Sequence, residues 1–374
     1  MPFKYLIILT LVIPVYFFGG CNITNQPEEE DQISSKLVVH IGNNPPGFWF
    51  FNTDSLTLID SLYTQERIGY LDVDSNKESI YWIDGSVQKK LNTYKLTSKS
   101  KSAVNTRGIS LKVSSDGEYI LTYKNFEPGL SEIYDSEDMN VVASDSLGRF
   151  LDVFTIPDRP FFYAIVYSEE GESQQSKLIS LNQENLQIEN EISLDYVNFS
   201  SFNDIGLSYD AKFFFLSNTD KSGAFGNFVV YDLELRAQVN QFQVGPYSKF
   251  SISPDGKEIY ITSRRSVNGT TPQNIQVLNY DISNKHIEVI IDDPSEIGLE
   301  GQYIESEHVL VSPDSKSIYL APGNKDKATG KYSDILQFDV EKRRVINSFE
   351  IPRDSLGRYS TFLINMDLVS TQSN

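Results

Sequence analysis

The sequence has few of the residues from which metal centres and nucleophilic catalytic sites are built. It contains one cysteine and three histidines in 374 residues. A single cysteine excludes an intramolecular disulfide. His40, His286 and His308 do not lie at the spacing of metal ligands, so neither a zinc site nor a Ser-His-Asp triad is supported. From the sequence we predict no catalytic set, no metal site and no cofactor.

Positive charge is also scarce. Lys and Arg number 32 against 51 Asp and Glu, which gives a formal net charge of −19. A surface of this sign repels phosphate backbones and anionic lipid headgroups. We therefore expect no nucleic-acid partner, and contact with a membrane through a lipid anchor only.

Helical periodicity is missing from residue 37 onward, where short runs of alternating apolar and polar residues recur between turn residues. Hydrophobic residues make up 40% of the chain and aromatic residues 12%, which is ample for a large core. These features predict an all-β domain, and the regular recurrence of turn residues indicates sequence repeats.

The clearest repeat is Ser251–Ser263, in which a Ser-Pro-Asp-Gly turn joins two alternating strands. Pro254 and Asp255 suit the two central positions of a type I turn, and Gly256 tolerates the conformation that follows. The turn aspartate recurs as Asp116, Asp158, Asp210 and Asp314. Ala211, Ser315 and Arg159 replace the glycine, so those hairpins must turn differently or be strained. We interpret these aspartates as caps of their own turns.

The first copy of the turn contains Asp72-x-Asp74-x-Asn76, which looks like the start of a calcium loop. Lys77 and Ile83 stand where that loop needs Gly and Glu, so the cage cannot close. A hairpin turn is the better interpretation.

A second strand pair follows each hairpin, and six complete four-strand units extend from Ile68 to Ile351. The remaining strands are Leu37–Ile41, Phe48–Asn52 and Leu56–Leu62 near the N-terminus and Tyr359–Asn365 near the C-terminus. Together they make a seventh unit. Sharing one blade between the two ends closes a ring and removes unpaired edges.

The repeat resembles the YVTN and WD40-like β-propeller repeats over essentially the whole of residues 37–374. The expected fold is a seven-bladed β-propeller of four-stranded antiparallel blades, in which N- and C-terminal strands share the closing blade. A different count around Phe150–Leu194 would give six or eight blades. The YVTN resemblance also includes propellers of the lactonase type, but no residues here match a catalytic set, and propellers host many functions.

Basic residues stand at the junctions that lead into most innermost strands, which surround the channel mouth on one face. They are Arg67, Arg107, Arg149, Lys249, His308 and Arg358, and Asn203 and Asp204 replace them in one blade. In a protein of charge −19 such a ring would focus potential on an anionic ligand. Pairing with carboxylates of neighbouring blades, or plain solvation, is the alternative.

The N-terminal residues 1–20 resemble a bacterial lipoprotein signal peptide. Lys4 precedes the apolar run Tyr5–Phe18, and Gly19 and Gly20 stand directly before Cys21, the expected lipidation site. An uncleaved anchor and an ordinary secretion signal are the alternatives. Residues 21–36 are polar and acidic, which predicts a flexible tether.

The tether resembles those of Bacteroidota lipoproteins, which implies a cell-envelope location, in the outer membrane. Both the cell surface and the periplasmic side of that membrane are compatible with the sequence. The expected function is a non-catalytic binding module that uses its channel face. Its partner would be an envelope protein, a glycan or a small anionic ligand. A propeller hydrolase or lyase acting on a sugar or lactone, and a structural scaffold in an envelope complex, are the alternatives.

We expect the full chain to incorporate a labelled fatty acid in its native host, and Cys21→Ala to abolish the incorporation, because the thiol of Cys21 is the predicted acceptor. Label that persists in Cys21→Ala, or that never enters the wild-type protein, would contradict the lipoprotein assignment.

Overall fold

The structure, a computed structural model, describes residues 34–42, 46–64, 66–74, 76–124, 129–170, 173–197, 199, 202–219, 225–265, 274–292, 304–324, 335–350 and 362–371. The chain divides into two compact units, and the larger one spans Ser35–Thr371. The predicted signal peptide, Cys21 and all but the last residues of the tether lie outside the described residues, as does Arg358. Within the described part of the chain we find no helix with the length and hydrophobicity needed to cross a bilayer.

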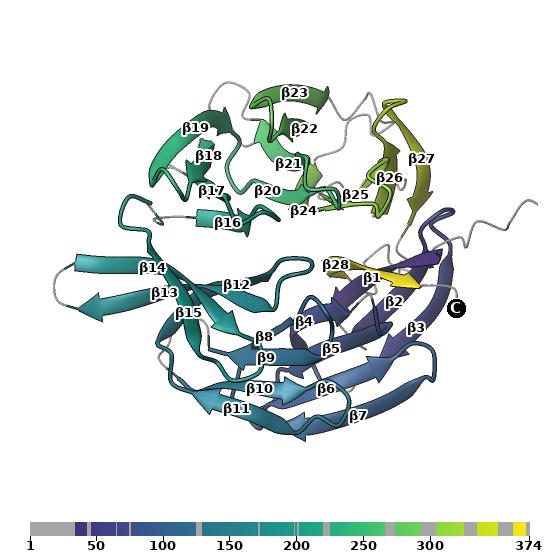
Figure 1. The fold of residues 1–374 in the computed structure, drawn as a ribbon. Coiled ribbons are helices and arrows are strands. Elements are labelled where there is room, and N and C mark those ends of the chain that lie inside the picture. Colours follow the sequence, from purple (N-terminus) through teal and green to yellow (C-terminus); the bar gives the residue numbers. More distant parts are fainter. Residues whose placement is uncertain are drawn as a thin grey trace, which may run out of the picture. The chain divides into compact units, whose positions relative to one another are not determined.

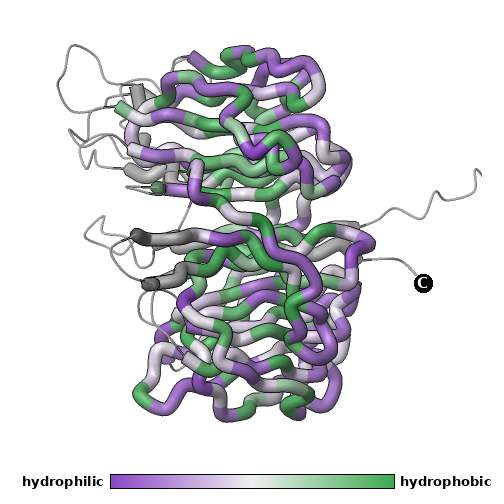
Figure 2. Tube along the Cα trace, turned by 60° about the vertical axis from the view of Figure 1, so that its left-hand side comes forward, coloured by the Kyte–Doolittle hydropathy of each residue, from purple (hydrophilic) through white to green (hydrophobic). Residues whose placement is uncertain are grey.

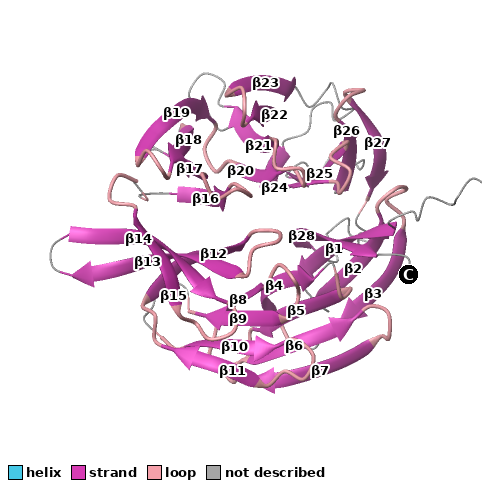
Figure 3. Cartoon of the chain, in the orientation of Figure 1, coloured by secondary structure: helices cyan, strands magenta, loops and turns pink. Residues whose placement is uncertain are grey.

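Every regular element described is a strand (Figure 3), and the strands form seven four-stranded sheets. Blade 1 contains β1 (Ser34–Gly42), β2 (Gly47–Asn52), β3 (Leu58–Tyr63) and β28 (Phe362–Thr371). Blade 2 contains β4 (Ile68–Asp74), β5 (Ser79–Asp84), β6 (Lys90–Lys95) and β7 (Ser100–Asn105). Blade 3 contains β8 (Ser110–Val113), β9 (Tyr119–Tyr123), β10 (Ser131–Asp135) and β11 (Val141–Asp145). Blade 4 contains β12 (Arg149–Thr155), β13 (Phe161–Glu170), β14 (Ser173–Asn182) and β15 (Ile188–Ser193).

Blade 5 contains β16 (Phe202–Leu207), β17 (Phe213–Thr219), β18 (Gly226–Asp232) and β19 (Ala237–Val244). Blade 6 contains β20 (Lys249–Ile252), β21 (Glu258–Arg265), β22 (Asn274–Asp281) and β23 (His286–Ile291). Blade 7 contains β24 (Ile304–Val311), β25 (Ser317–Asn324), β26 (Ile335–Asp339) and β27 (Arg344–Phe349).

The seven blades form a ring, which confirms the predicted propeller (Figure 1). The innermost strands contact one another in a closed cycle, from β28 through β4, β8, β12, β16, β20 and β24 back to β28. The sheet order β28-β1-β2-β3 confirms that strands from the two ends of the chain complete one blade. The last strand continues to Thr371, beyond the predicted end at Asn365, and the predicted start at Tyr359 lies outside the described residues.

The blades are held together by apolar packing between their faces. The buried apolar residues of the described chain form seven clusters, each shared by two neighbouring blades. Second strands such as β5 are buried along their whole length, whereas outermost strands such as β7 are largely exposed. Hydrophobic and hydrophilic stretches therefore alternate within short distances along the chain (Figure 2).

Four of the five predicted turn aspartates cap their own hairpins. In the repeat Ser251–Ser263 the Ser253 hydroxyl donates to Oδ1 of Asp255 at 2.6 Å and accepts from the Glu258 N–H at 2.9 Å. The same pair of bonds is present around Asp116, Asp210 and Asp314. These four carboxylates therefore serve the geometry of the turns.

The three hairpins without glycine show both predicted outcomes: two have a strained residue in the glycine position, and one forms a different turn. Ala211 and Ser315 both adopt the left-handed conformation of Gly256, with φ of 59° against 70°, and so carry strain. In the Ile156–Arg159 turn, the positive φ of 60° lies at Asp158 instead, so this hairpin uses a different turn.

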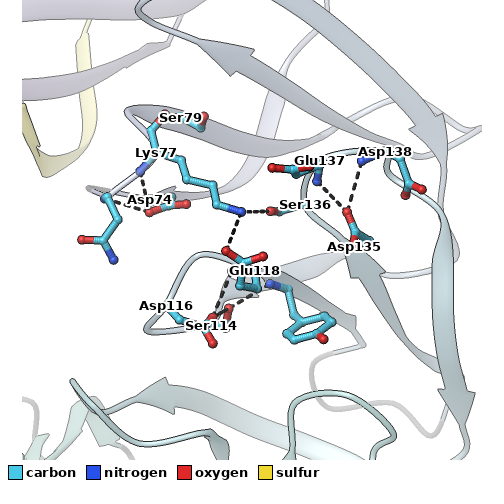
Figure 4. Close-up of polar contacts among 12 residues, drawn as sticks. Asp74, Lys77, Ser79, Ser114, Asp116, Glu118, Asp135, Ser136, Glu137 and Asp138 are labelled. Carbon is cyan, nitrogen blue, oxygen red and sulfur yellow. Dashed lines mark hydrogen bonds and ion pairs between the residues drawn. The ribbon is translucent and has the colours of Figure 1, made fainter. Parts of the chain in front are cut away.

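β4 ends at Asp74, and the turn that contains Asn76 and Lys77 joins it to β5, which confirms the predicted hairpin and ties blade 2 to blade 3 (Figure 4). Oδ1 of Asp74 accepts the N–H groups of Asn76 and Lys77 at 2.8 and 3.1 Å. The Lys77 ammonium reaches blade 3, where it contacts Glu118 at 3.1 Å and the Ser136 hydroxyl at 3.0 Å. Asp74 is buried, and its side chain lies against Gly117.

Two glycines at the same turn position provide a matched test. We expect Gly117→Ala to lower the free energy of unfolding by about 2–4 kcal/mol, because the new Cβ meets both a positive φ of 76° and the buried Asp74 carboxylate. Gly256→Ala should cost about 1 kcal/mol, since its Cβ only approaches the Tyr209 ring. Urea denaturation measures both, and equal losses would contradict this account.

Candidate functional site

Charged side chains lie along the innermost strands, at the wall of the channel. They are Asp72 on β4, Lys112 on β8, Asp152 on β12, Asp204 on β16, Lys249 on β20 and Asp367 on β28. They carry complementary charges and come from blades 1 to 6.

Two of these carboxylates bridge neighbouring blades and bind backbone N–H groups of the next innermost strand. Asp72 accepts from the Val113 N–H at 2.7 Å and pairs with the Lys112 ammonium at 3.0 Å. Asp204 repeats the arrangement, accepting from the Phe250 N–H at 2.9 Å with the Lys249 ammonium 3.9 Å away. The charges thus satisfy donors on a strand edge that no further strand covers.

The other two carboxylates each accept the N–H of the next residue in their own strand. The bonds run from Val153 to Asp152 and from Leu368 to Asp367, both at 2.8 Å. Burial, together with the charge of Asp204, raises the pKa of Asp152 to about 7. Burial and the charge of Asp72 likewise raise the pKa of Asp367 to about 7.

The neighbouring ionisable groups respond to the same surroundings. Burial raises the pKa of Asp204, although Lys249 opposes the shift. Burial lowers the pKa of Lys112, but the carboxylates of Asp72 and Asp367 outweigh it, and the net pKa is raised. Lys112 therefore remains an ammonium, whereas the pKa values of Asp152 and Asp367 lie near neutral pH.

A cavity of about 510 Å³ opens beside these groups, at the end of the channel where the hairpin turns lie. Its walls come from the innermost strands of six blades and include Lys112, Phe154, Ile205, Phe250, Leu310 and Leu368. Tyr209, Pro254 and Pro313 of three hairpin turns form its rim. Among the described residues, Lys112 is the one charged side chain that lines the cavity.

The predicted basic residues that are described stand at the opposite ends of the innermost strands. Arg67, Arg107, Arg149 and Lys249 enter blades 2, 3, 4 and 6, one in each. Lys249 donates to the carbonyl of Asn203 at 2.6 Å and lies beside Asp204 of the preceding blade. Arg67 and Arg107 are exposed.

The remaining predicted site residues are less fully described. His308 lies in β24, opposite Ala321, and only its backbone is described. Arg358 and Cys21 lie outside the described residues. Of the other histidines, His40 is buried in β1 beside Phe48, and His286 is exposed in β23. The anion-binding ring thus stays a prediction.

The sequence pattern did not indicate the channel carboxylates, because alternation identifies the innermost strands only as arms of hairpins. Asp72 fits the start of a calcium loop, and Asp204 stands out only as the exception to the basic ring. A usable signal was present, since each carboxylate stands between two apolar residues, Asp152 between Leu151 and Val153 and Asp367 between Met366 and Leu368. Such an interruption is unusual in a buried strand.

Solved structures share this fold at low sequence identity. The chain is similar to a candidate 6-phosphogluconolactonase from Bacteroides uniformis, with a TM-score of 0.58 and 12% identity over 90% of this chain and 100% of that one. The β-propeller domain of Cps50 (Swd1) from Myceliophteria thermophila gives a TM-score of 0.52 and 10% identity over 78% of this chain and 89% of that one.

The dihydro-heme d1 dehydrogenase NirN gives a TM-score of 0.55 and 16% identity over 87% of this chain, which spans 65% of that protein's length. No protein-family model and no curated protein sequence matches the chain. At these identities the likeness shows the β-propeller fold alone.

The raised pKa of Asp152 predicts a specific dependence of stability on pH. Between its unfolded pKa of about 3.9 and its folded pKa of about 7, the folded state binds more protons, so this stabilising contribution is present below about pH 4 and is lost as the pH rises through 7. Asp152→Asn should match the wild type near pH 4 and exceed its free energy of unfolding at pH 8 by on the order of 2–4 kcal/mol.

Urea denaturation at pH 4, 6 and 8 measures the difference. Asp255→Asn is the control of opposite sign, because the Ser253 hydroxyl lowers the pKa of Asp255. That variant should lose a little stability at pH 8. An Asp152→Asn variant equally destabilised at pH 4 and pH 8 would contradict the assignment.

Proposed function

We propose that the chain is a cell-envelope lipoprotein whose propeller is a non-catalytic binding module that takes its ligand in the channel. Cys21 would carry the lipid, and residues 21–36 would hold the propeller away from the membrane. The partner is an envelope protein segment, a glycan or a small anionic ligand.

The cavity at the turn end of the channel carries this proposal. Its volume of about 510 Å³ suits a small ligand, and apolar side chains make up most of its wall. The Lys112 ammonium provides one fixed charge at which an anionic group can be oriented. A binding pocket of this kind needs few polar groups, provided that they are held in place.

The hydrogen bonds and ion pairs of the channel carboxylates favour a binding site over a catalytic site. Asp72 and Asp204 are occupied by backbone N–H groups and by the lysines of the next blade. Replacing them would therefore disturb the contact between blades before it affected a ligand. The charged groups support the pocket, and the apolar residues form its surface.

A hydrolase is the second candidate, and one observation favours it. Asp152 and Asp367 have pKa values of about 7, which suits a general acid or base, and both lie next to residues that line the cavity. The similar fold of the candidate 6-phosphogluconolactonase is compatible with this alternative. A hydrolase would lose turnover in Asp152→Asn while keeping its affinity for substrate.

Filling the cavity tests the proposal. Ser251 lines the cavity from β20, so Ser251→Trp should occlude it, whereas Lys257→Trp in the same hairpin places a tryptophan at a side chain that is 76% exposed. After exposure of the full chain in detergent to envelope extract, native mass spectrometry should find a bound species in the wild type and in Lys257→Trp. Ser251→Trp should lose it.

As a control, the circular dichroism spectrum and the thermal midpoint of Ser251→Trp must match those of the wild type, which establishes that the variant is folded. A bound species that persists in Ser251→Trp, or none in the wild type, would contradict binding in the channel. Release of a chemically altered product would support the hydrolase instead.

A further inference from the structure

A second pocket lies between blades 2 and 3, on the face opposite the hairpin turns. Its volume is about 590 Å³. Three separate segments line it: Val87–Lys89 between β5 and β6, Asn105–Arg107 from the end of β7 into the link to β8, and the residues Lys124 and Leu130 between β9 and β10. No innermost-strand residue among those described lines it, so it is distinct from the channel cavity.

The charged side chains among the described residues that line this pocket are all basic. Lys89, Arg107 and Lys124 contribute to the wall, and none of the described residues that line it is acidic. Three cations around one pocket are notable in a chain whose formal net charge is −19. The pocket is therefore a local site of positive potential on an acidic protein.

The buried carboxylate of Glu132 fixes the segment that carries Arg107. Oε2 of Glu132, which is 8% exposed, accepts from the Arg107 N–H at 3.2 Å, from the Tyr134 hydroxyl at 2.8 Å and from the Thr106 hydroxyl at 3.4 Å. The Thr106 N–H in turn donates to the carbonyl of Lys89 at 3.1 Å.

These bonds hold the backbone of Lys89 and of Arg107 in one arrangement and leave the guanidinium exposed toward the pocket. Glu132 brings a negative charge beneath the site, but three donors already bind that carboxylate oxygen, and its side chain does not line the pocket.

We infer that this pocket binds a phosphate or sulfate group carried by a small polar molecule. A planar guanidinium, here that of Arg107, binds two oxygens of such a group at once, and the Lys89 ammonium supplies further positive charge. Asn105 and Gln88 add uncharged hydrogen-bonding side chains for the rest of the ligand. The inference does not depend on the proposed channel ligand.

Isothermal titration calorimetry on the full chain in nonionic detergent, at low salt, tests it. The probes are inorganic phosphate, inorganic sulfate, glucose 6-phosphate and glucose 6-sulfate, with glucose as the neutral control. We expect the esters to bind and glucose not to bind, and raising the salt concentration should weaken binding. The tighter of the two esters identifies the preferred group.

The variants assign the site. Lys89→Gln with Arg107→Gln should weaken binding of the better ester at least tenfold, and Arg107→Lys should fall between this variant and the wild type because the bidentate contact is lost. Lys316→Gln, which neutralises a side chain 79% exposed on a hairpin turn, makes the matched charge change elsewhere and should bind as the wild type does. Thermal midpoints confirm that each variant is folded.

Binding that is unchanged in the double variant would overturn the inference, as would equal binding of glucose or no binding of either ester at millimolar concentration. Ser251→Trp separates the two sites, because occluding the channel should leave ester binding intact. Loss of ester binding in Ser251→Trp alone would place the anion in the channel, and the inference would be wrong while the proposed function stood.

Discussion

The structure depends on how the innermost strands are satisfied at the edge that faces the channel. Each blade ends there in a strand with no further ladder partner, and an unpaired buried N–H group is costly. Carboxylates of the preceding blade meet this need at Val113 and Phe250, and the lysine next to each N–H completes the pair. The blades are thus joined by apolar clusters over their faces and by these charged bonds along the channel.

This constraint explains where the functional surfaces lie. Asp72 and Asp204 are bound to backbone N–H groups, so the described residues that line the cavity beside them are mainly apolar and include one ammonium, that of Lys112. At the other face, chain segments cross between blades and are fixed by buried groups such as Glu132, so side chains like Arg107 can point outward. The same scaffold therefore presents one mainly apolar pocket and one cationic pocket, at opposite ends of the strands.

The blade count and the closure were predictable because they follow from local turn chemistry and from counting strands. Pro254, Asp255 and Gly256 specify a hairpin whatever surrounds them. The end of the final strand, at Thr371 rather than Asn365, was missed because no hairpin turn follows it in the sequence to mark its limit. The pocket of Lys89, Arg107 and Lys124 joins three segments from two blades, and only Arg107 was singled out from the sequence. The role of Asp72 and Asp204 depends on which side of each innermost strand meets the next blade, which residue alternation alone does not specify.

Amide hydrogen exchange at Val113 and Phe250 tests most directly whether the channel carboxylates are structural. The account predicts that both N–H groups are protected in the wild type although they lie on strand edges. Asp72→Ala should lose protection selectively at Val113, and Asp204→Ala selectively at Phe250, with the remaining blades unchanged. Unchanged protection in both variants would contradict the account, because it would show that the channel carboxylates are free to act on a substrate.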